Sequence, residues 1–516
     1  MLDLRITLDG GPLEPADLFM WASTANDPSV RLTVEFAPEA RARVSECAAF
    51  VDRLLADGGP VYGLNTGFGH FAERPVPADR LEDLQVNLIR SHACAVGDDL
   101  PRDIVQAMWI LRLNTLCQGR SGIRLATMDS IVRLLREGVL ACVPSRGSVG
   151  ASGDLAPNAH AVLPLLGEGE CTRPNPASDG FERVSGAEAL SGIGLDPLRL
   201  APREGLALVN GTQLTTALAV KALARALHLW VTANVATALT MEAVGGAFSI
   251  LEDLVLATHH PGTQVAGRQM AGWLEGSTHL HGAAKDERFI QAPYCLRCAP
   301  QVHGAVWEEL ERGRSVLREE SRVISDNPLL FPERNEVYSC GNFHAIYPAR
   351  VSDALASAMT TLGSISERRV NLMMDEKLSG MPRFLVAEGG LNSGMMMLQV
   401  TAAALVSECR SLSMPASVDS IPTNCDREDH VSMGPIAGFK AIQIAEHLER
   451  IIAIELLAGA QALDLRNHIP LTCRIKRIQR RIRVRVPFLV EDRVLAPDIA
   501  VMVEMIRRGE VTCHAV

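Results

Sequence analysis

The chain has 516 residues and a formal net charge of −10, from 50 lysines and arginines against 60 aspartates and glutamates. Hydrophobic residues make up 47% of it and aromatic residues only 4%, with a mean hydropathy of +0.11. This apolar content excludes a disordered chain, and the acidic balance argues against nucleic acid as the main partner. With so few aromatic residues and so much alanine, leucine and valine, we expect a mainly α-helical fold.

The cysteines and the N-terminal residues bear on the compartment. The 12 cysteines are dispersed, and residues 1–14 carry charges where a secretory leader would have an apolar core. We therefore expect a cytoplasmic protein. Cys295 and Cys298 form a C-x-x-C pair without a second pair nearby, so we expect no metal site. The apolar region 206–251 is interrupted by three charged residues and predicts a soluble helix rather than a membrane span.

Apolar periodicity and turn residues predict the elements in chain order. A strand over Leu4–Leu8 precedes a helix that begins near Pro15. The shorter helices predicted next are Ala40–Leu55, Leu81–His92, Ile104–Leu116 and Gly122–Glu137, and the long ones are Gly205–Ala257, His303–Ser325, Ala349–Leu372, Leu391–Leu412 and Gly434–Gln461. Helices of this length are typical of a bundle.

Two other segments and the change in helix length suggest the domain organisation. Thr172–Pro202 is polar and contains glycine and proline, which predicts a surface insertion or a link between domains. In Arg474–Arg485 the basic residues alternate with apolar ones, so we expect a solvated helix or a subunit contact. We predict an N-terminal domain over residues 1–204 and a long-helix bundle with a C-terminal helical region over residues 205–516.

Two glycine-rich loops are the candidates for chemistry: Tyr62–Gly69, and Pro144–Pro157 with Ala151-Ser152-Gly153 inside it. The plain interpretation of the second loop is a tight turn, and a phosphate site is disfavoured because no P-loop lysine follows. The alternative is backbone chemistry. Attack of the Gly153 nitrogen on the Ala151 carbonyl carbon would close a five-membered ring, and dehydration at Ser152 would leave an electrophilic alkene. Glycine suits the attacking position because it has no Cβ.

These loops belong to a set of motifs by which the chain resembles, over nearly its whole length, the aromatic amino-acid ammonia-lyases and aminomutases. That family forms a 4-methylidene-imidazol-5-one (MIO) group from an Ala-Ser-Gly triplet. Seven motifs follow the family's order: YGLNTGFG at 62–69, GSVGASGDLAP at 147–157, LALVNGTQ at 206–213, QAPYCLRC at 291–298, SDNPL at 325–329, GNFH at 341–344 and EDHVSM at 428–433. The resemblance implies a helical, fumarase/aspartase-like fold, with the MIO loop in a smaller N-terminal domain.

The resemblance also implies catalytic roles. Tyr62 matches the base that removes the β-proton, a role that needs surroundings favouring the phenolate. Ala151, Ser152 and Gly153 would supply the MIO electrophile. Asn210 matches a donor to the MIO oxygen. The plain alternatives are a core aromatic residue for Tyr62 and a helix N-cap for Asn210.

Four more positions match substrate contacts of the family. Arg297 corresponds to the arginine that holds the substrate carboxylate, for which a planar guanidinium is suited. Tyr294 and Gln291 correspond to neighbours that orient substrate and electrophile, and Phe343 to a pocket-lining residue. A structural ion pair is the alternative for Arg297, and ordinary core packing is the alternative for Phe343.

Two positions bear on the substrate. In this family a histidine at the place of His92 goes with histidine enzymes and some tyrosine aminomutases, and a glutamate at the place of Glu428 goes with histidine enzymes. A carboxylate can accept an imidazole N–H, whereas a phenyl ring would leave both polar groups unpaired. The resemblance thus favours conversion of L-histidine to trans-urocanate. A lyase or 2,3-aminomutase of tyrosine or another aryl amino acid is the alternative, and a structural network with His430 is the plain interpretation of Glu428.

Several departures keep the aminomutase alternative open. Ile346 and Tyr347 replace a usual Glu-Pro, Met414 replaces a common histidine, and Arg427 adds a cation beside the proposed ring-binding carboxylate. A non-catalytic helical scaffold is disfavoured because the motif residues are complete. Family members are homotetramers with active sites built from three subunits. The resemblance therefore implies a homotetramer that acts on a small molecule, an amino acid. The composition argues against nucleic acid and a membrane as partners.

Overall fold

The computed structural model describes residues 2–245, 248–277, 291–466 and 470–512. The chain divides into two compact units. The first unit is Met1–Ala224, Arg314–Asp353 and Pro415–Phe439, and the second is Arg225–Gly313, Ala354–Met414 and Lys440–Val516. The chain leaves the first unit after Ala224 and returns to it twice, and the domain boundary at residue 204 stays a prediction.

The first unit mixes helices with small sheets. β1 and β2 pair in parallel, β3 and β5 are antiparallel, β4, β6 and β7 form a three-stranded antiparallel sheet, and β8 and β9 form a hairpin. Its strands are β1 (Leu2–Leu8), β2 (Val30–Phe36), β3 (Val96–Asp99), β4 (Leu140–Ala141), β5 (Pro144–Arg146), β6 (Glu170–Pro174), β7 (Phe181–Ser185), β8 (Leu329–Phe331) and β9 (Glu336–Tyr338). Its helices are α1 (Pro15–Ser23), α2 (Pro38–Asp57), α3 (Leu81–His92), α4 (Arg102–Leu116), α5 (Leu125–Arg136), α6 (Leu155–Val162), α7 (Gly186–Gly192) and α8 (Glu204–Val209), and 3₁₀ turns are η1 (Thr24–Asn26), η2 (Gly69–Phe71), η3 (Ala78–Arg80), η4 (Leu163–Leu166) and η6 (Pro332–Arg334).

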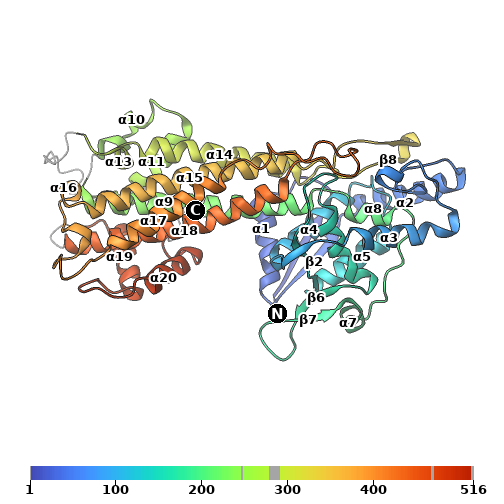
Figure 1. Ribbon diagram of the computed structural model, residues 1–516, viewed down its shortest axis with the longest axis horizontal. Coiled ribbons are helices and arrows are strands. Elements are labelled where there is room, and N and C mark those ends of the chain that lie inside the picture. Colours follow the sequence, from blue (N-terminus) through green and yellow to red (C-terminus); the bar gives the residue numbers. More distant parts are fainter. Residues whose placement is uncertain (1, 246–247, 278–290, 467–469, 513–516) are drawn as a thin grey trace. The chain divides into compact units, whose positions relative to one another are not determined.

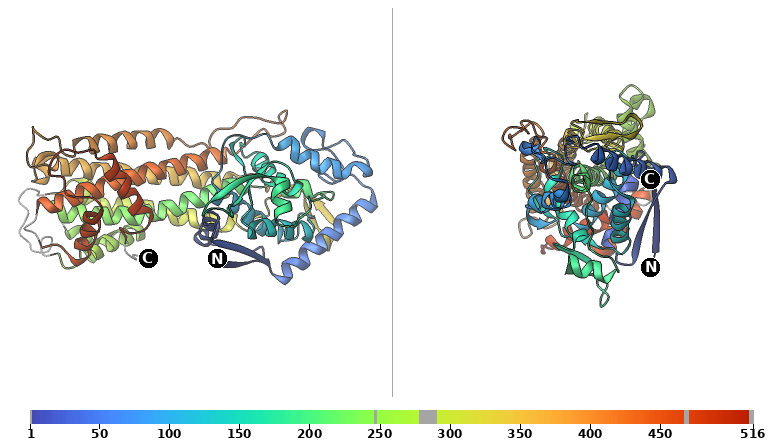
Figure 2. Two further views of the ribbon diagram at one scale, coloured as in Figure 1. Left: turned by 90° about the horizontal axis from the view of Figure 1, so that it is seen from below. Right: turned by 90° about the vertical axis from the view of Figure 1, so that its right-hand side faces the viewer.

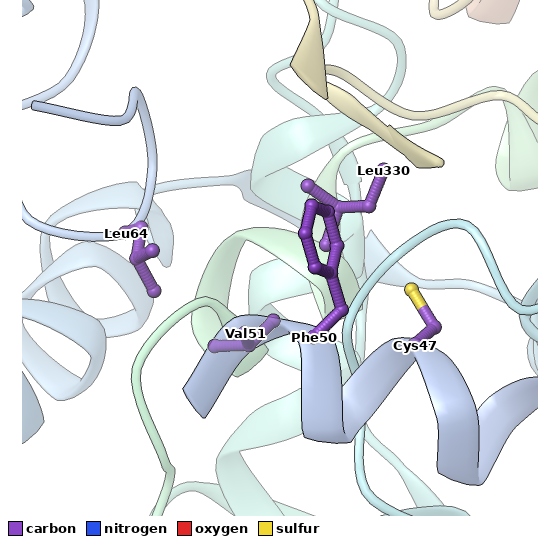
Figure 3. Close-up of a cluster of buried hydrophobic side chains, with 5 residues drawn as sticks. All are labelled: Cys47, Phe50, Val51, Leu64 and Leu330. Atoms are coloured by element: carbon purple, nitrogen blue, oxygen red, sulfur yellow. The ribbon is translucent and has the colours of Figure 1, made fainter. Parts of the chain in front are cut away.

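The glycine loop after α2 is anchored by an apolar cluster. α2 begins with a proline at its first position and ends at Gly58, whose left-handed φ of 74° suits a helix C-terminus. Two residues beyond Tyr62, the loop inserts Leu64 into a cluster with Phe50 and Val51 of α2 and Leu330 of β8 (Figure 3). Because these side chains are buried, they fix the position of the loop that carries Tyr62.

Long helices form the core of the second unit, where they lie side by side in the views of Figures 1 and 2. Four helices have residues in both units: α9 (Gln213–Val244), α14 (Ala299–Glu320), α15 (Ile346–Met374) and α18 (Gly434–Leu465). The remaining described helices of the second unit are α10 (Asp253–Leu256), α11 (Pro261–Trp273), α13 (Tyr294–Arg297), α16 (Glu376–Ser379), α17 (Met396–Leu412), α19 (Cys473–Arg485) and α20 (Ala496–Arg507), with 3₁₀ turns η5 (Phe248–Leu251) and η7 (Arg383–Leu385).

A buried ion pair joins three of these helices. Arg369 on α15 and Glu455 on α18 are both fully buried, with 2.6 Å between Nε and Oε1. The same carboxylate accepts hydrogen bonds from the hydroxyls of Thr240 on α9 and Ser366 on α15. Both charges of this pair are therefore neutralised and hydrogen-bonded, as burial in an apolar core requires.

Most predicted elements are confirmed, and the fold is mainly helical as expected. One expectation was wrong. Gly205–Ala257 is not one helix, because the chain is extended at Asn210 between α8 and α9, and α9 ends at Val244. Thr172–Pro202, predicted as a surface insertion or a link, contains most of the β6–β7 hairpin and α7. The basic run Arg474–Arg485 is helical, with three isoleucines of α19 buried.

Two properties of the described residues bear on membranes and metals. Within that part of the chain, α9 is the one helix long and apolar enough to cross a membrane, and 67% of its most apolar stretch is buried inside the protein. The same residues contain no group of three or more histidine, cysteine, aspartate or glutamate side chains placed to hold a metal ion.

Candidate active site

The Ala151-Ser152-Gly153 triplet forms a tight turn between β5 and α6. Gly150 and Gly153 have φ angles of 67° and 72°, in the left-handed region that favours glycine. A Cβ at Gly153 would lie 2.2 Å from the carbonyl oxygen of Gly211. The Asp154 N–H donates to that same oxygen at 2.7 Å. The turn is thus held against the backbone at Gly211 so closely that only glycine fits.

Two side chains from distant segments bind Ser152. The amide Nδ2 of Asn210 donates to the Ser152 carbonyl oxygen at 2.9 Å, and the Ser152 hydroxyl donates to Oε1 of Glu428 at 2.8 Å. The second carboxylate oxygen of Glu428 accepts from the Thr423 hydroxyl at 2.6 Å. Asn210 follows α8 and precedes α9 by three residues, so its amide serves the triplet and is not an N-cap.

The segment that follows Glu428 packs under the triplet. Met433 donates its backbone N–H to the Val149 carbonyl at 2.8 Å, and the Ser432 hydroxyl donates to the Gly150 carbonyl at 3.0 Å. Val149 and Ala151 also pack against an apolar cluster that includes Met433. These contacts bring the EDHVSM motif to the triplet across more than 270 residues of sequence, which places Glu428 where it can bind Ser152.

Asp154 is a fully buried carboxyl directly after the triplet. Burial raises its pKa to about 6, although hydrogen bonds from the backbone N–H and hydroxyl of Thr215 and the hydroxyl of Ser148 favour the charged form. Through these hydrogen bonds the Asp154 carboxyl connects the residues before and after the triplet to the first turn of α9. The sequence prediction missed this residue, although its position next to the triplet could have drawn attention to it.

Tyr62 lies at the edge of a cavity in its own loop. Its half-buried hydroxyl accepts a hydrogen bond from the Gly69 N–H at 3.3 Å, and its ring makes an edge contact with Phe68. The cavity has a volume of about 730 Å³ and is lined by Tyr62 and its neighbours in residues 55–81. A Cβ at Gly69 would lie 2.5 Å from the side chain of Asn424, so this loop contacts the turn that leads to Glu428.

His92 is the last residue of α3, and its ring is oriented by its own helix. Its Nδ1 lies 2.9 Å from the Leu88 carbonyl, so Nδ1 carries the proton and Nε2 has a free lone pair in this geometry. The chain then continues into β3, which pairs with β5, the strand before the triplet. His92 is thus connected to the triplet loop through this two-stranded sheet.

Phe343 lies directly before His344, whose ring stacks on the ring of His430. His344 and His430 have ring centroids 5.4 Å apart, and Nε2 of His344 lies 3.2 Å from the His430 carbonyl oxygen. This contact brings the GNFH motif next to the EDHVSM motif. Phe343 is half-buried, so packing in the core does not account for its whole surface.

The predicted carboxylate-binding residues form a separate group in the second unit. Nη1 of Arg297 donates to Oε1 of Gln291 at 2.6 Å, and the Arg297 guanidinium lies 4.8 Å from the centroid of the Tyr294 ring. Tyr294 is 70% exposed. Within the described residues the buried Nε of Arg297 has no hydrogen-bond partner, so the guanidinium retains a donor for a carboxylate.

Comparison with known proteins identifies the family. Residues 19–483 match the family model described as aromatic amino acid lyase. The chain belongs to that family. It is 47% identical over 480 residues to the histidine ammonia-lyase of Symbiobacterium thermophilum, covering 92% of this chain and 93% of that protein.

Solved structures agree with the family. The histidine ammonia-lyase of Trypanosoma cruzi is 39% identical with a TM-score of 0.88, over 98% of this chain and 94% of that one. The tyrosine aminomutase of Streptomyces globisporus is 34% identical with a TM-score of 0.91, over 98% of both chains. The predictions of the family, of a carbon–nitrogen lyase and of the mainly helical fold are confirmed. The individual roles of the site residues stay predictions.

Proposed function

We propose that this aromatic amino acid lyase converts L-histidine to trans-urocanate and ammonia. The observation that carries the proposal is the position of Glu428, whose carboxylate is bound to the Ser152 hydroxyl of the triplet. A carboxylate at this place can accept an imidazole N–H from the substrate, and the free Nε2 of His92 offers a second acceptor. The name of the relative that is 47% identical agrees with this substrate.

We further propose that Ala151, Ser152 and Gly153 form the MIO group. The residues present fit it in two respects. Gly153 is confined against Gly211 in a left-handed conformation, and the Asn210 amide already donates to the Ser152 carbonyl oxygen, which becomes the ring oxygen on cyclisation. Once formed, the group supplies an electrophile for the substrate's amino group. Asn210 then stabilises negative charge that develops on the oxygen it binds.

The remaining steps use ordinary side chains. Arg297 binds the substrate carboxylate with its guanidinium fork, and Gln291 and Tyr294 hold that guanidinium in place. Tyr62 removes the β-proton as general base. Phe343 lines the pocket beside the substrate ring. Fixing the carboxylate and the ring at opposite ends of the substrate sets the Cβ–H bond toward the base.

Assembly and compartment are part of the proposal. We infer a cytoplasmic homotetramer in which three subunits contribute to each active site, so that Tyr62, the triplet and Arg297 need not meet within one chain. The 70% exposure of Tyr294 in the single chain supports this, because a substrate-orienting aromatic ring is expected to be covered in the working enzyme.

Conversion of tyrosine or another aryl amino acid, including by a 2,3-aminomutase, is the second candidate. The relatedness to a tyrosine aminomutase and the departures from the histidine-lyase pattern favour it. Among these departures, Tyr347 and Met414 are 66% and 69% exposed, and Arg427 is also exposed beside Glu428. An aminomutase retains ammonia and returns it to Cβ, so the two candidates differ in their product.

One experiment separates the candidates. The purified protein is incubated with histidine, tyrosine and phenylalanine in turn, and the products are identified by mass and ultraviolet absorbance. Urocanate from histidine supports the proposal, whereas a β-amino acid or an arylacrylate from tyrosine supports the second candidate. The intact mass of the protein should show the loss of two waters. Ser152→Ala lacks the hydroxyl that leaves as water, so it should not show this loss of two waters and should lose nearly all deamination; an unchanged rate in this variant would refute the MIO assignment.

A further inference from the structure

A fully buried arginine lies behind Asn210. Arg112 on α4 is 2% exposed, and its guanidinium reaches the backbone where α8 ends. Nη1 donates to the Asn210 carbonyl oxygen at 2.8 Å, and Nη2 donates to the Ala207 carbonyl oxygen. A guanidinium is planar and can bind two carbonyls at once, which a lysine ammonium on its flexible stem does less rigidly.

Arg112 is one of two side chains that bind this segment. Asn158 on α6 donates its Nδ2 to the Val209 carbonyl oxygen at 2.9 Å and to that of Gly211 at 3.3 Å. Together the two side chains take up the carbonyls of residues 207, 209, 210 and 211. These are the groups that a continuous helix would have satisfied. The extended backbone at Asn210, with φ −81° and ψ 103°, is thus held by tertiary contacts.

The guanidinium of Arg112 is itself fixed by a buried cluster. Nη2 lies 3.6 Å from Oδ2 of Asp326, and Nη2 of Arg203 lies 2.9 Å from Oδ1 of the same carboxylate. Asp326 is fully buried, and Arg203 also donates to the Pro328 carbonyl at 3.0 Å. Burying three charges costs desolvation free energy. In this cluster the ion pairs hold the Arg112 guanidinium rigidly, with its N–H donors directed at the Asn210 backbone.

The segment that Arg112 holds serves two features of the site. Its Gly211 carbonyl is the surface against which Gly153 is confined, and its Asn210 side chain donates to the Ser152 carbonyl oxygen. A movement of the backbone at Asn210 and Gly211 would have two effects at once: it would relax the turn of the triplet, and it would turn the Asn210 amide away from the Ser152 carbonyl. A misplacement of about 1 Å near reacting groups can reduce a rate about 100-fold.

We propose that Arg112 is a positioning residue that acts through Asn210 and Gly211, both in closure of the triplet and in turnover. This inference rests on the proposed function. The buried cluster of Arg112, Asp326 and Arg203 thereby contributes to the reaction. Among the described residues, none of these three side chains is hydrogen-bonded or ion-paired to the triplet itself.

The test compares two arginines of α4, the buried Arg112 and the half-buried Arg102. Arg112→Lys keeps the charge and removes the fork. The matched control is Arg102→Lys, whose guanidinium donates to the carbonyls of Ala25 and Gly138 and stacks on the Phe181 ring at 3.7 Å. Each variant is purified as the full chain. Three quantities are measured: the fraction of chains that have lost two waters, by intact mass; kcat and KM for histidine, normalised to that fraction; and the melting temperature.

We expect Arg112→Lys to lower the dehydrated fraction and to reduce kcat in the dehydrated chains about 10- to 100-fold, with KM changed less than about threefold. Arg102→Lys should dehydrate fully and keep kcat within about twofold, even if both variants melt at the same lower temperature. Equal behaviour of the two variants in dehydration and kcat would overturn the inference.

A second variant covers the case in which Arg112→Lys fails to fold. Asn158→Ser removes the other donor to the same segment and should lower the dehydrated fraction and kcat in the same pattern. Full dehydration with unchanged kcat in Asn158→Ser would overturn the idea that this segment must be held. Failure of the proposed function has a different signature: the wild-type protein would lose two waters and yet release no urocanate, while the mass comparison between variants would still decide the role of Arg112.

Discussion

Replacing Glu428 with glutamine tests whether this carboxylate recognises the substrate ring. In the structure the two oxygens of Glu428 accept hydrogen bonds from the hydroxyls of Ser152 and Thr423. Glutamine has the same shape and keeps one acceptor oxygen, and a hydroxyl can rotate to accept from its NH₂ group. Dehydration of the triplet removes the Ser152 hydroxyl, so the Thr423 hydroxyl is the partner that remains in the dehydrated chain. We therefore expect Glu428→Gln to fold and to retain this contact, so that the main change is the loss of negative charge.

The magnitude follows from the bond that is weakened. A hydrogen bond to a charged partner contributes about 1.5–3 kcal/mol, compared with about 0.5–1.5 kcal/mol for a neutral one. With about 1.4 kcal/mol for each tenfold change, the loss of charge should weaken recognition of an imidazole roughly 10-fold, and at most about 100-fold. A phenyl ring offers no N–H to the carboxylate, so its recognition should not weaken.

Two unreactive ligands give the clearest assay. Imidazolepropionate and phenylpropionate lack the amino group, and their inhibition constants report ring recognition separately from chemistry. In Glu428→Gln the inhibition constant of imidazolepropionate should rise about 10- to 100-fold, while that of phenylpropionate stays within about threefold. Asp429→Asn, at the exposed neighbouring carboxylate, should change neither constant. An equal weakening of both ligands in Glu428→Gln would refute the reasoning, because it would mean that Glu428 acts only by holding the loop.

Three further changes test the triplet and its surroundings. Gly153→Ala places a Cβ 2.2 Å from the Gly211 oxygen at a left-handed φ, so we expect about 2–5 kcal/mol of lost stability in urea unfolding and no dehydrated mass; a fully dehydrated variant would contradict this. Asn210→Ala removes the donor to the Ser152 carbonyl and should reduce kcat about 100- to 1,000-fold with a much smaller change in KM. Asp154→Asn tests the raised pKa of about 6, against an ordinary 3.8. Because the folded protein holds this proton more tightly than the unfolded chain, Asp154 contributes most stability below about pH 4 and loses up to about 3 kcal/mol of it as the pH rises through 6. Urea midpoints of wild type and variant should therefore converge or cross between pH 4 and 7, and parallel profiles would contradict the assignment.

The long helices could be predicted from the sequence because their apolar residues recur at helical spacing and glycine or proline marks their ends. Ala349–Leu372 and Gly434–Gln461 were predicted, and the structure has α15 over Ile346–Met374 and α18 over Gly434–Leu465. The break at Asn210 was missed because apolar residues continue on both sides of it, although Asn210-Gly211 is a dipeptide typical of turns. What breaks the helix is a set of donors from α4 and α6, which are 50 to 100 residues earlier in the sequence.

The candidate active site, too, could be predicted only in part from the sequence. Motif order alone brought Asn210, Ser152 and Glu428 to attention, and the structure places these three in direct contact. No role was predicted for Arg112, Asn158 or Asp154. Their hydrogen bonds nevertheless fix the backbone around the triplet and Asn210. A signal for Arg112 did exist, since an arginine stands among the isoleucine and leucines of a helix that is buried on nearly all sides. A charged side chain in such a helix must have buried polar partners, because desolvation of an unpaired charge costs too much free energy. For Arg112 these partners include the backbone carbonyls of the non-helical segment at Asn210.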